Sequence, residues 1–96
     1  MWKIFLSREC DKKLKKEDPE VARRILQDLD ILKEDPLRGS AVQDARARKI
    51  NLRYIEVARD YRAFYLIKDN RVFSQCYYKR ETCYEEIKRY LAILKL

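Results

Sequence analysis

The sequence predicts an α+β fold in which an N-terminal strand and an antiparallel helical hairpin precede an antiparallel β-meander and a C-terminal helix. Three patterns predict it: helical spacing of apolar residues over 8–33, alternation with a period of two after residue 46, and a helix-start signal at Thr82. The chain has 96 residues, 47% of them hydrophobic, which suits a single domain over 1–96 with one core. A two-domain enzyme with an interdomain cleft is therefore excluded.

Capping residues define the helices expected in the first half of the chain. Ser7 and Asp18 are good N-caps, and Pro19 fits the first helical position. Asp35-Pro36 ends the second helix, because the residue before a proline disfavours the helical conformation. The short connection between the helices predicts an antiparallel hairpin. The expected elements are a strand over 2–7, a helix over 8–16, a helix over 19–34 and a loop over 37–45.

Alternating apolar residues predict three strands in the second half. The Asp69-Asn70 pair suits a tight turn between the last two strands, which makes the sheet an antiparallel meander. Thr82 and Glu85 form a capping box, so a final helix is expected from Thr82 to the C-terminus. Apolar residues lie on more than one face of this helix. The helix could therefore be an ordinary packed terminal helix, or a partner protein could displace it. The expected strands are Lys49–Tyr54, Tyr61–Ile67 and Arg71–Tyr78.

The positive charge is concentrated in the second half. The chain has 23 Lys and Arg against 16 Asp and Glu, a net charge of +7. Residues 1–45 contain ten cations and ten acids, whereas residues 46–96 contain thirteen cations and six acids and all seven tyrosines. Aromatic rings among cations suit RNA, because bases stack on rings and phosphates bind cations. Tyrosine and phenylalanine also favour strands, so a purely structural role is the alternative.

Composition excludes several kinds of site. The chain has no histidine, which excludes catalytic triads and dyads built on imidazole. Three cysteines, with no CxxC pair and no secretory signal, favour buried thiols in a reducing cytoplasm over disulfides or a metal site. No apolar run reaches the roughly 20 residues that cross a bilayer. We therefore expect a cytoplasmic protein with no cofactor, no metal and no membrane partner.

Cations on the expected strands mark the candidate site. Arg62 stands inside an apolar run, so its side chain either reaches back to water or serves a site. The neighbouring cations are candidate RNA contacts, although charges at strand ends also protect sheet edges. These candidate RNA contacts are Arg48, Arg53, Arg59 and Lys79.

Such a basic site could cleave RNA without a metal, because the substrate supplies its own 2′-hydroxyl nucleophile. A lysine surrounded by arginines has a lowered pKa, so its neutral amine can accept a proton. Arginine side chains stabilise the doubly charged phosphorane. Such a site could therefore cleave RNA without a metal ion.

Three segments resemble the RelE/ParE superfamily of small bacterial and archaeal toxins: Lys49–Arg53, Asp60–Tyr65 with its following turn, and Lys79–Tyr84. In the family, these three segments correspond in order to a basic strand, a strand with Gly-Tyr-Arg or Asp-Tyr-Arg, and a His-Arg or Lys-Arg motif followed by a tyrosine. The resemblance covers essentially the whole chain and rests on the order of the three motifs. It implies the toxin of a type II toxin–antitoxin system.

In RelE-like members, the resemblance implies a ribosome-dependent endoribonuclease that enters the empty A site and cuts messenger RNA. Lys49 would be the base or a phosphate contact, and Arg62 would stabilise the scissile phosphate. Arg80 would lie near the leaving group, and Tyr84 would orient or stack on a nucleotide. Asn51 replaces a second lysine of RelE and cannot accept a proton.

The resemblance also implies partners and alternative functions. The partners would be a cognate antitoxin, with which the chain would form a heterotetramer, and the ribosome with its messenger RNA and 16S rRNA. Asn51 motivates two alternatives without cleavage: a ParE-type inhibitor of DNA gyrase, or a toxin that only docks on the ribosome. A third, less favoured alternative is a general nucleic-acid binder. Affinity for free RNA or DNA that falls steeply with salt and does not require the ribosome would favour it.

Overall fold

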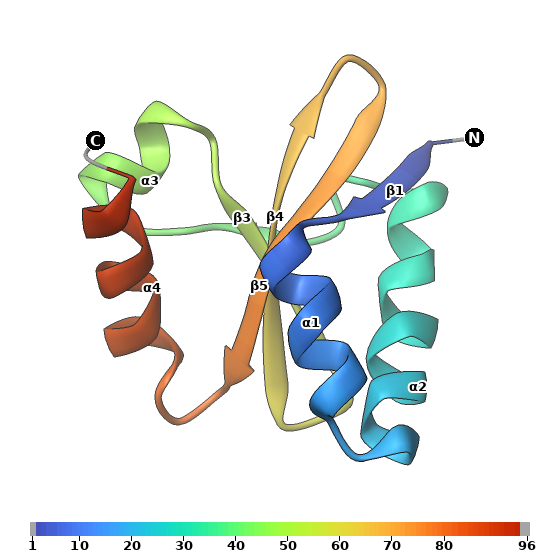
Figure 1. Ribbon diagram of the computed structural model, residues 1–96. Coiled ribbons are helices and arrows are strands. Elements are labelled where there is room, and N and C mark those ends of the chain that lie inside the picture. The colour runs from blue at the N-terminus through green and yellow to red at the C-terminus, as the bar shows by residue number, and fades with distance from the viewer. Residues whose placement is uncertain (1, 95–96) are drawn as a thin grey trace.

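A computed structural model describes residues 2–94 and shows helices on both faces of a five-stranded sheet (Figure 1). The strand order is β1-β5-β4-β3-β2. Two helices cover one face, and α4 with the short α3 lies on the other. The strands are β1 (Lys3–Leu6), β2 (Ser40–Ala41), β3 (Arg53–Val57), β4 (Tyr61–Lys68) and β5 (Arg71–Lys79). The helices are α1 (Arg8–Lys16), α2 (Pro19–Leu29), the 3₁₀ helix η1 (Asp30–Lys33), α3 (Ala45–Lys49) and α4 (Cys83–Ile93).

The helical hairpin forms where the caps predict it. The Ser7 hydroxyl accepts a hydrogen bond from the Cys10 amide at 3.0 Å, and the Asp18 carboxylate accepts one from the Glu20 amide at 2.9 Å. Both bonds satisfy amides that a helix start leaves without a partner. The second helix changes to η1 at Asp30 and so ends close to the predicted stop.

The three long strands form the predicted antiparallel meander, and β1 adds to it in parallel. Strand β4 pairs with β3 on one side and with β5 on the other. Asp69 and Asn70 both have positive φ, at 51° and 62°, as a two-residue turn of type I′ requires. Strand β1 pairs with β5 with Phe5 opposite Phe73. The meander therefore lies inside the sheet, with β1 and β2 at its edges.

The strand predicted over Lys49–Tyr54 is wrong at its start. Residues 45–49 form α3, because the Asp44 carboxylate accepts hydrogen bonds from the Arg46 and Ala47 amides at 2.8 and 3.4 Å and caps a helix. Asn51 then takes the left-handed conformation, with φ at 54°, and ends it. The strand begins only at Arg53. The loop predicted just before this segment contains the two-residue strand β2.

Side chains of β4 alternate between two hydrophobic cores. Ala63 and Tyr65 are buried against the hairpin helices, whereas Phe64 is buried beneath α3 and α4. This is the alternation that the sequence predicts. Arg62 is on the same side as Phe64, so the meander directs it toward α4.

Helix α4 begins where predicted but without the predicted capping box. Thr82 is its N-cap, yet its side chain makes no capping hydrogen bond. Its backbone, with φ at −113° and ψ at 0°, lacks the extended conformation of a side-chain N-cap. Instead, the Cys83 thiol donates to the Arg80 carbonyl at 3.3 Å. The helix is therefore tied back to the end of β5. The predicted helix includes residues 95 and 96, which lie outside the described part of the chain.

Candidate nucleic-acid interface

The guanidinium of Arg62 lies between two tyrosine rings. Its central carbon is 4.9 Å from the ring centroid of Tyr54 on β3 and 5.6 Å from that of Tyr84 on α4. The Arg62 side chain is 15% exposed, whereas Tyr84 is 59% exposed. Cation–π contacts of this kind fix a guanidinium without neutralising it. Arg62 is therefore held in place by rings while its charge stays available.

Glu56 joins Arg62 to Arg80. It stands directly opposite Arg62 across the β3–β4 pair, and one of its carboxylate oxygens is 3.8 Å from Arg62 Nη2 and 3.9 Å from Arg80 Nε. Both distances exceed a normal hydrogen bond, so the two ion pairs are loose. Loose pairs at a half-exposed carboxylate are weak and can exchange for another anion. The sequence analysis did not single out Glu56.

The remaining contacts of Arg62 anchor it to the start of α4. Its Nη1 atom is 3.7 Å from the Cys83 sulfur, and its Nε atom is buried with no hydrogen-bond partner among residues 2–94. Burial lowers the pKa of Arg62, but its contacts with Tyr84 and Cys83 outweigh burial and raise the pKa above its usual value. The guanidinium therefore stays charged at every physiological pH.

The other predicted site residues lie in three places: on α3, at the start of β3, and in a groove beside Arg80. Arg48 and Lys49 are exposed on α3, which Figure 1 shows near the C-terminal end of α4. The length of β3 separates them from Glu56. Arg53 donates from its Nη2 atom to the carbonyls of Leu37 and Gly39, at 3.0 and 2.5 Å. Arg53 therefore holds the loop before β2, and Lys49 is at the opposite end of β3 from Arg62.

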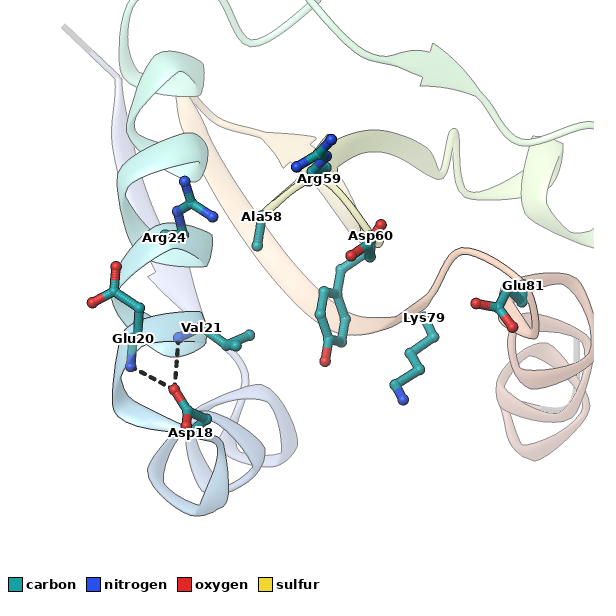
Figure 2. Close-up of a pocket in the computed structure, with 10 residues that line it drawn as sticks. Asp18, Glu20, Val21, Arg24, Ala58, Arg59, Asp60, Lys79 and Glu81 are labelled. Atoms are coloured by element: carbon teal, nitrogen blue, oxygen red, sulfur yellow. Dashed lines mark hydrogen bonds between the residues drawn. The ribbon is translucent and has the colours of Figure 1, made fainter.

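Arg59 and Lys79 line a groove next to Arg80. The groove has a volume of about 570 Å³ and lies between the start of α2, the β3–β4 turn and the end of β5 (Figure 2). The Arg80 amide donates to the Asp60 carbonyl at 2.9 Å, which joins the groove to the Arg62 cluster. The groove is lined by Asp18, Glu20, Val21, Arg24, Ala58, Arg59, Asp60, Tyr61, Lys79 and Glu81.

These groups suit phosphate chemistry. Two arginines around one point can bind the oxygens of a phosphodiester, and an exposed ring such as Tyr84 can stack on a base. Within residues 2–94, no three residues with metal-binding side chains come together. No helix in the same range is long and apolar enough to cross a membrane.

Solved structures that match this fold include three of RelE proteins. A chain of the intact E. coli RelBE toxin–antitoxin complex matches with a TM-score of 0.67 and 17% identity, over 82% of this chain and 96% of that one. The isolated E. coli RelE toxin matches with a TM-score of 0.64 and 18% identity, over 93% and 98%. A chain of the RelE–RelB complex of Pyrococcus horikoshii matches with a TM-score of 0.58 and 19% identity, over 82% and 94%.

The chain therefore has the RelE fold, as the three sequence motifs predict. The similarity is seen in the structure comparison alone, because no protein-family model and no curated protein matches the sequence.

Proposed function

We propose that the chain is a RelE-like toxin that cleaves messenger RNA on the ribosome. The observation that supports this most is the loose bridge from Glu56 to both Arg62 and Arg80, beside the rings of Tyr54 and Tyr84. In this bridge, two arginines approach one carboxylate that can accept a proton. A phosphodiester with a neighbouring 2′-hydroxyl needs these groups for transesterification.

In the proposed reaction, Glu56 gives up its arginine partners to the phosphate and accepts the proton of the 2′-hydroxyl. The 2′-oxygen then forms a bond to phosphorus while the bond from phosphorus to the 5′-oxygen breaks. Arg62 stabilises the charge on the phosphorane. Arg80 hydrogen-bonds to the departing 5′-oxygen, which takes its proton from water. The products are a 2′,3′-cyclic phosphate and a 5′-hydroxyl.

Glu56 takes the role that the sequence analysis gave to Lys49. Lys49 is at the far end of β3 on α3, so it suits a contact with a distant part of the RNA or ribosome better than proton transfer beside Arg62. Tyr84 keeps its proposed role, because its exposed ring can stack on a nucleotide next to the scissile phosphate.

The proposal includes the partners of such a toxin. Two of the similar structures are toxin–antitoxin complexes, and we propose that this chain also binds a cognate antitoxin in the cytoplasm. A positively charged surface suits an acidic partner, because complementary charges steer association.

Growth arrest and mapping of new RNA ends test the proposal together. Expression of the toxin should stop growth, and primer extension should reveal new 5′ ends within the codons of translated messages. The double variant Arg62→Ala with Arg80→Ala should lose both effects, and Arg62→Lys should retain part of the cleavage because it keeps the charge. Circular dichroism checks that each variant is folded. Undiminished cleavage by the folded double variant would refute the proposal.

The alternatives without cleavage lose their original motivation. They rested on Asn51, whose amide cannot accept a proton, but the reaction proposed above uses Glu56 as the proton acceptor and needs no lysine at position 51. Growth arrest without new 5′ ends, accompanied by inhibited supercoiling, would instead identify a gyrase inhibitor.

A further inference from the structure

The turn between β3 and β4 has an unfavourable backbone. Ala58 and Arg59 are consecutive residues with positive φ, at 48° and 69°, and neither is glycine or asparagine. Side chains with a Cβ atom disfavour this region, and such strain tends to persist at functional sites. Asn-Gly would form a left-handed turn more easily. The turn therefore retains an arginine where glycine would be more stable.

Hydrogen bonds hold this turn against two neighbouring elements. The Ala58 amide donates to Asp28 Oδ2 of α2 at 2.7 Å. The Arg80 amide, just after β5, donates to the Asp60 carbonyl at 2.9 Å. The turn therefore has a fixed position between α2 and the end of β5, and Arg59 is one of the residues that line the groove there (Figure 2).

The groove is large enough for a small ligand. Its 570 Å³ adjoins a second cavity of about 290 Å³, which shares Arg24, Ala58 and Arg59. Ligand sites in proteins commonly have about 300–1,000 Å³. Tyr61, half-buried, gives the groove an aromatic ring. This volume suits one nucleotide, with room along the turn for the next phosphate.

Three cations among the residues that line the groove have no carboxylate partner in the described part of the chain and can bind a phosphate. Among the ion pairs formed within residues 2–94, none includes Arg24, Arg59 or Lys79. The acids nearest to α2 are already engaged, since Asp18 accepts from helix amides and Glu20 binds Arg23. The two carboxylates that remain, Asp60 and Glu81, can accept hydrogen bonds from the amino groups of a base.

We propose that this groove binds one nucleotide of single-stranded RNA beside the phosphate that Arg62 and Arg80 hold. Arg59 and Lys79, which lie on opposite sides of the groove in Figure 2, bind the phosphates on the two sides of this nucleotide, and its base lies against Tyr61. This rests on the proposed function, because it extends the path of the same RNA strand past Arg80. The strained turn then has a function: it keeps Arg59 on this path.

Binding of an RNA that cannot be cleaved tests the groove without the reaction. The probe is a fluorescent eight-nucleotide RNA of mixed sequence with 2′-O-methyl riboses, measured by anisotropy with the free protein. Arg59→Gly should weaken binding about tenfold, the effect of losing one charge-assisted hydrogen bond. The slope of log affinity against log salt should become shallower by about one. The same variant should melt at a higher temperature, which excludes unfolding as the cause.

Two control variants separate the groove from net charge and from backbone strain. Ala58→Gly relieves strain in the same turn but keeps Arg59, so it should raise the melting temperature without changing the affinity. Lys68→Ala removes one charge at the opposite end of β4 and should bind RNA like the wild type. Lys79→Ala should weaken binding like Arg59→Gly.

Three results would refute RNA binding in the groove. They are no binding of the probe to the wild-type protein, an unchanged affinity in Arg59→Gly, or a loss of affinity in Lys68→Ala equal to that in Arg59→Gly. Failure of the proposed function is a separate result. If messenger RNA is not cleaved on ribosomes but Arg59→Gly still binds the probe more weakly than the wild type and Lys68→Ala does not, RNA binding in the groove is supported and the proposed nuclease activity is refuted.

Discussion

Arg62 is a half-buried cation whose partners are mostly rings and a thiol. Tyr54, Tyr84 and Cys83 surround it without cancelling its charge, and the carboxylate of Glu56 approaches no nearer than 3.8 Å. A tightly paired arginine would need to break strong hydrogen bonds before it could bind a phosphate. The observed arrangement avoids that cost, and it makes Glu56 the residue whose replacement is most informative.

Replacing Glu56 and Lys49 one at a time distinguishes the two candidate proton acceptors. Glu56→Gln keeps the size of the side chain but removes its basicity, so it should slow cleavage about 100-fold or more, as expected for loss of a general base. Lys49→Met should change the rate only a few-fold. The measurement is the rate at which the purified protein cleaves messenger RNA on programmed ribosomes. The opposite pattern, with Lys49→Met inactive and Glu56→Gln active, would restore the lysine as the base.

Asn51 has a conformational role that can be tested by stability alone. Its positive φ favours asparagine and glycine over lysine. Asn51→Lys should therefore lower the free energy of unfolding by about 1 kcal/mol, and Asn51→Gly should leave it nearly unchanged. Urea denaturation measures both. A lysine variant as stable as the wild type would show that the left-handed conformation imposes no constraint here.

At the scale of elements, α3 depends on its cap. Its sequence ARARK has little apolar surface, with only Ala47 buried, so packing alone explains little of its stability. Hydrogen bonds from the Arg46 and Ala47 amides to the Asp44 carboxylate supply the start signal. This helix should therefore respond to acid before the rest of the domain.

The hydrogen bond from the Arg46 amide holds the pKa of Asp44 below its ordinary value of 3.8. A lowered pKa in the folded state means that the stabilisation is complete above the unfolded value and is lost as pH falls through the folded value. The melting temperature of the wild type should therefore include a component that disappears between about pH 5 and pH 2. Asp44→Asn keeps a capping acceptor and should lack this component. Identical acid profiles for the two proteins would contradict the assignment.

Local signals predict most of the elements but not the partners of the site. The caps at Ser7 and Asp18 and the turn at Asp69-Asn70 act within a few residues, so the sequence reveals them. The short α3 was not predicted because it lacks apolar periodicity, and the predicted strand began at its last residue, Lys49. Arg62 stood out as a lone cation in an apolar run. Glu56 did not, because its position depends on which residue of β3 pairs with Arg62.

At the scale of the whole molecule, all three cysteines are buried. Cys10, Cys76 and Cys83 have exposed fractions of 1%, 3% and 0%, and burial raises the pKa of Cys76 to about 12. A thiolate is the reactive form, so these thiols should be inert in the folded protein. A thiol reagent such as DTNB should label none of them under native conditions and all three in denaturant. Rapid labelling of one thiol in the folded protein would reveal local opening.

The parallel pairing of β1 with β5 has a consequence for the order of folding. Lys3 is aligned with Arg71, so the first strand finds its partner only after nearly three quarters of the chain has followed it. Contacts between such distant residues form late, because a long loop must close before they bring any gain. A ribosome making this protein would therefore release the meander and its arginines from the exit tunnel before the sheet is complete. Pairing of β1 with β5 should therefore be a late step in completing the sheet.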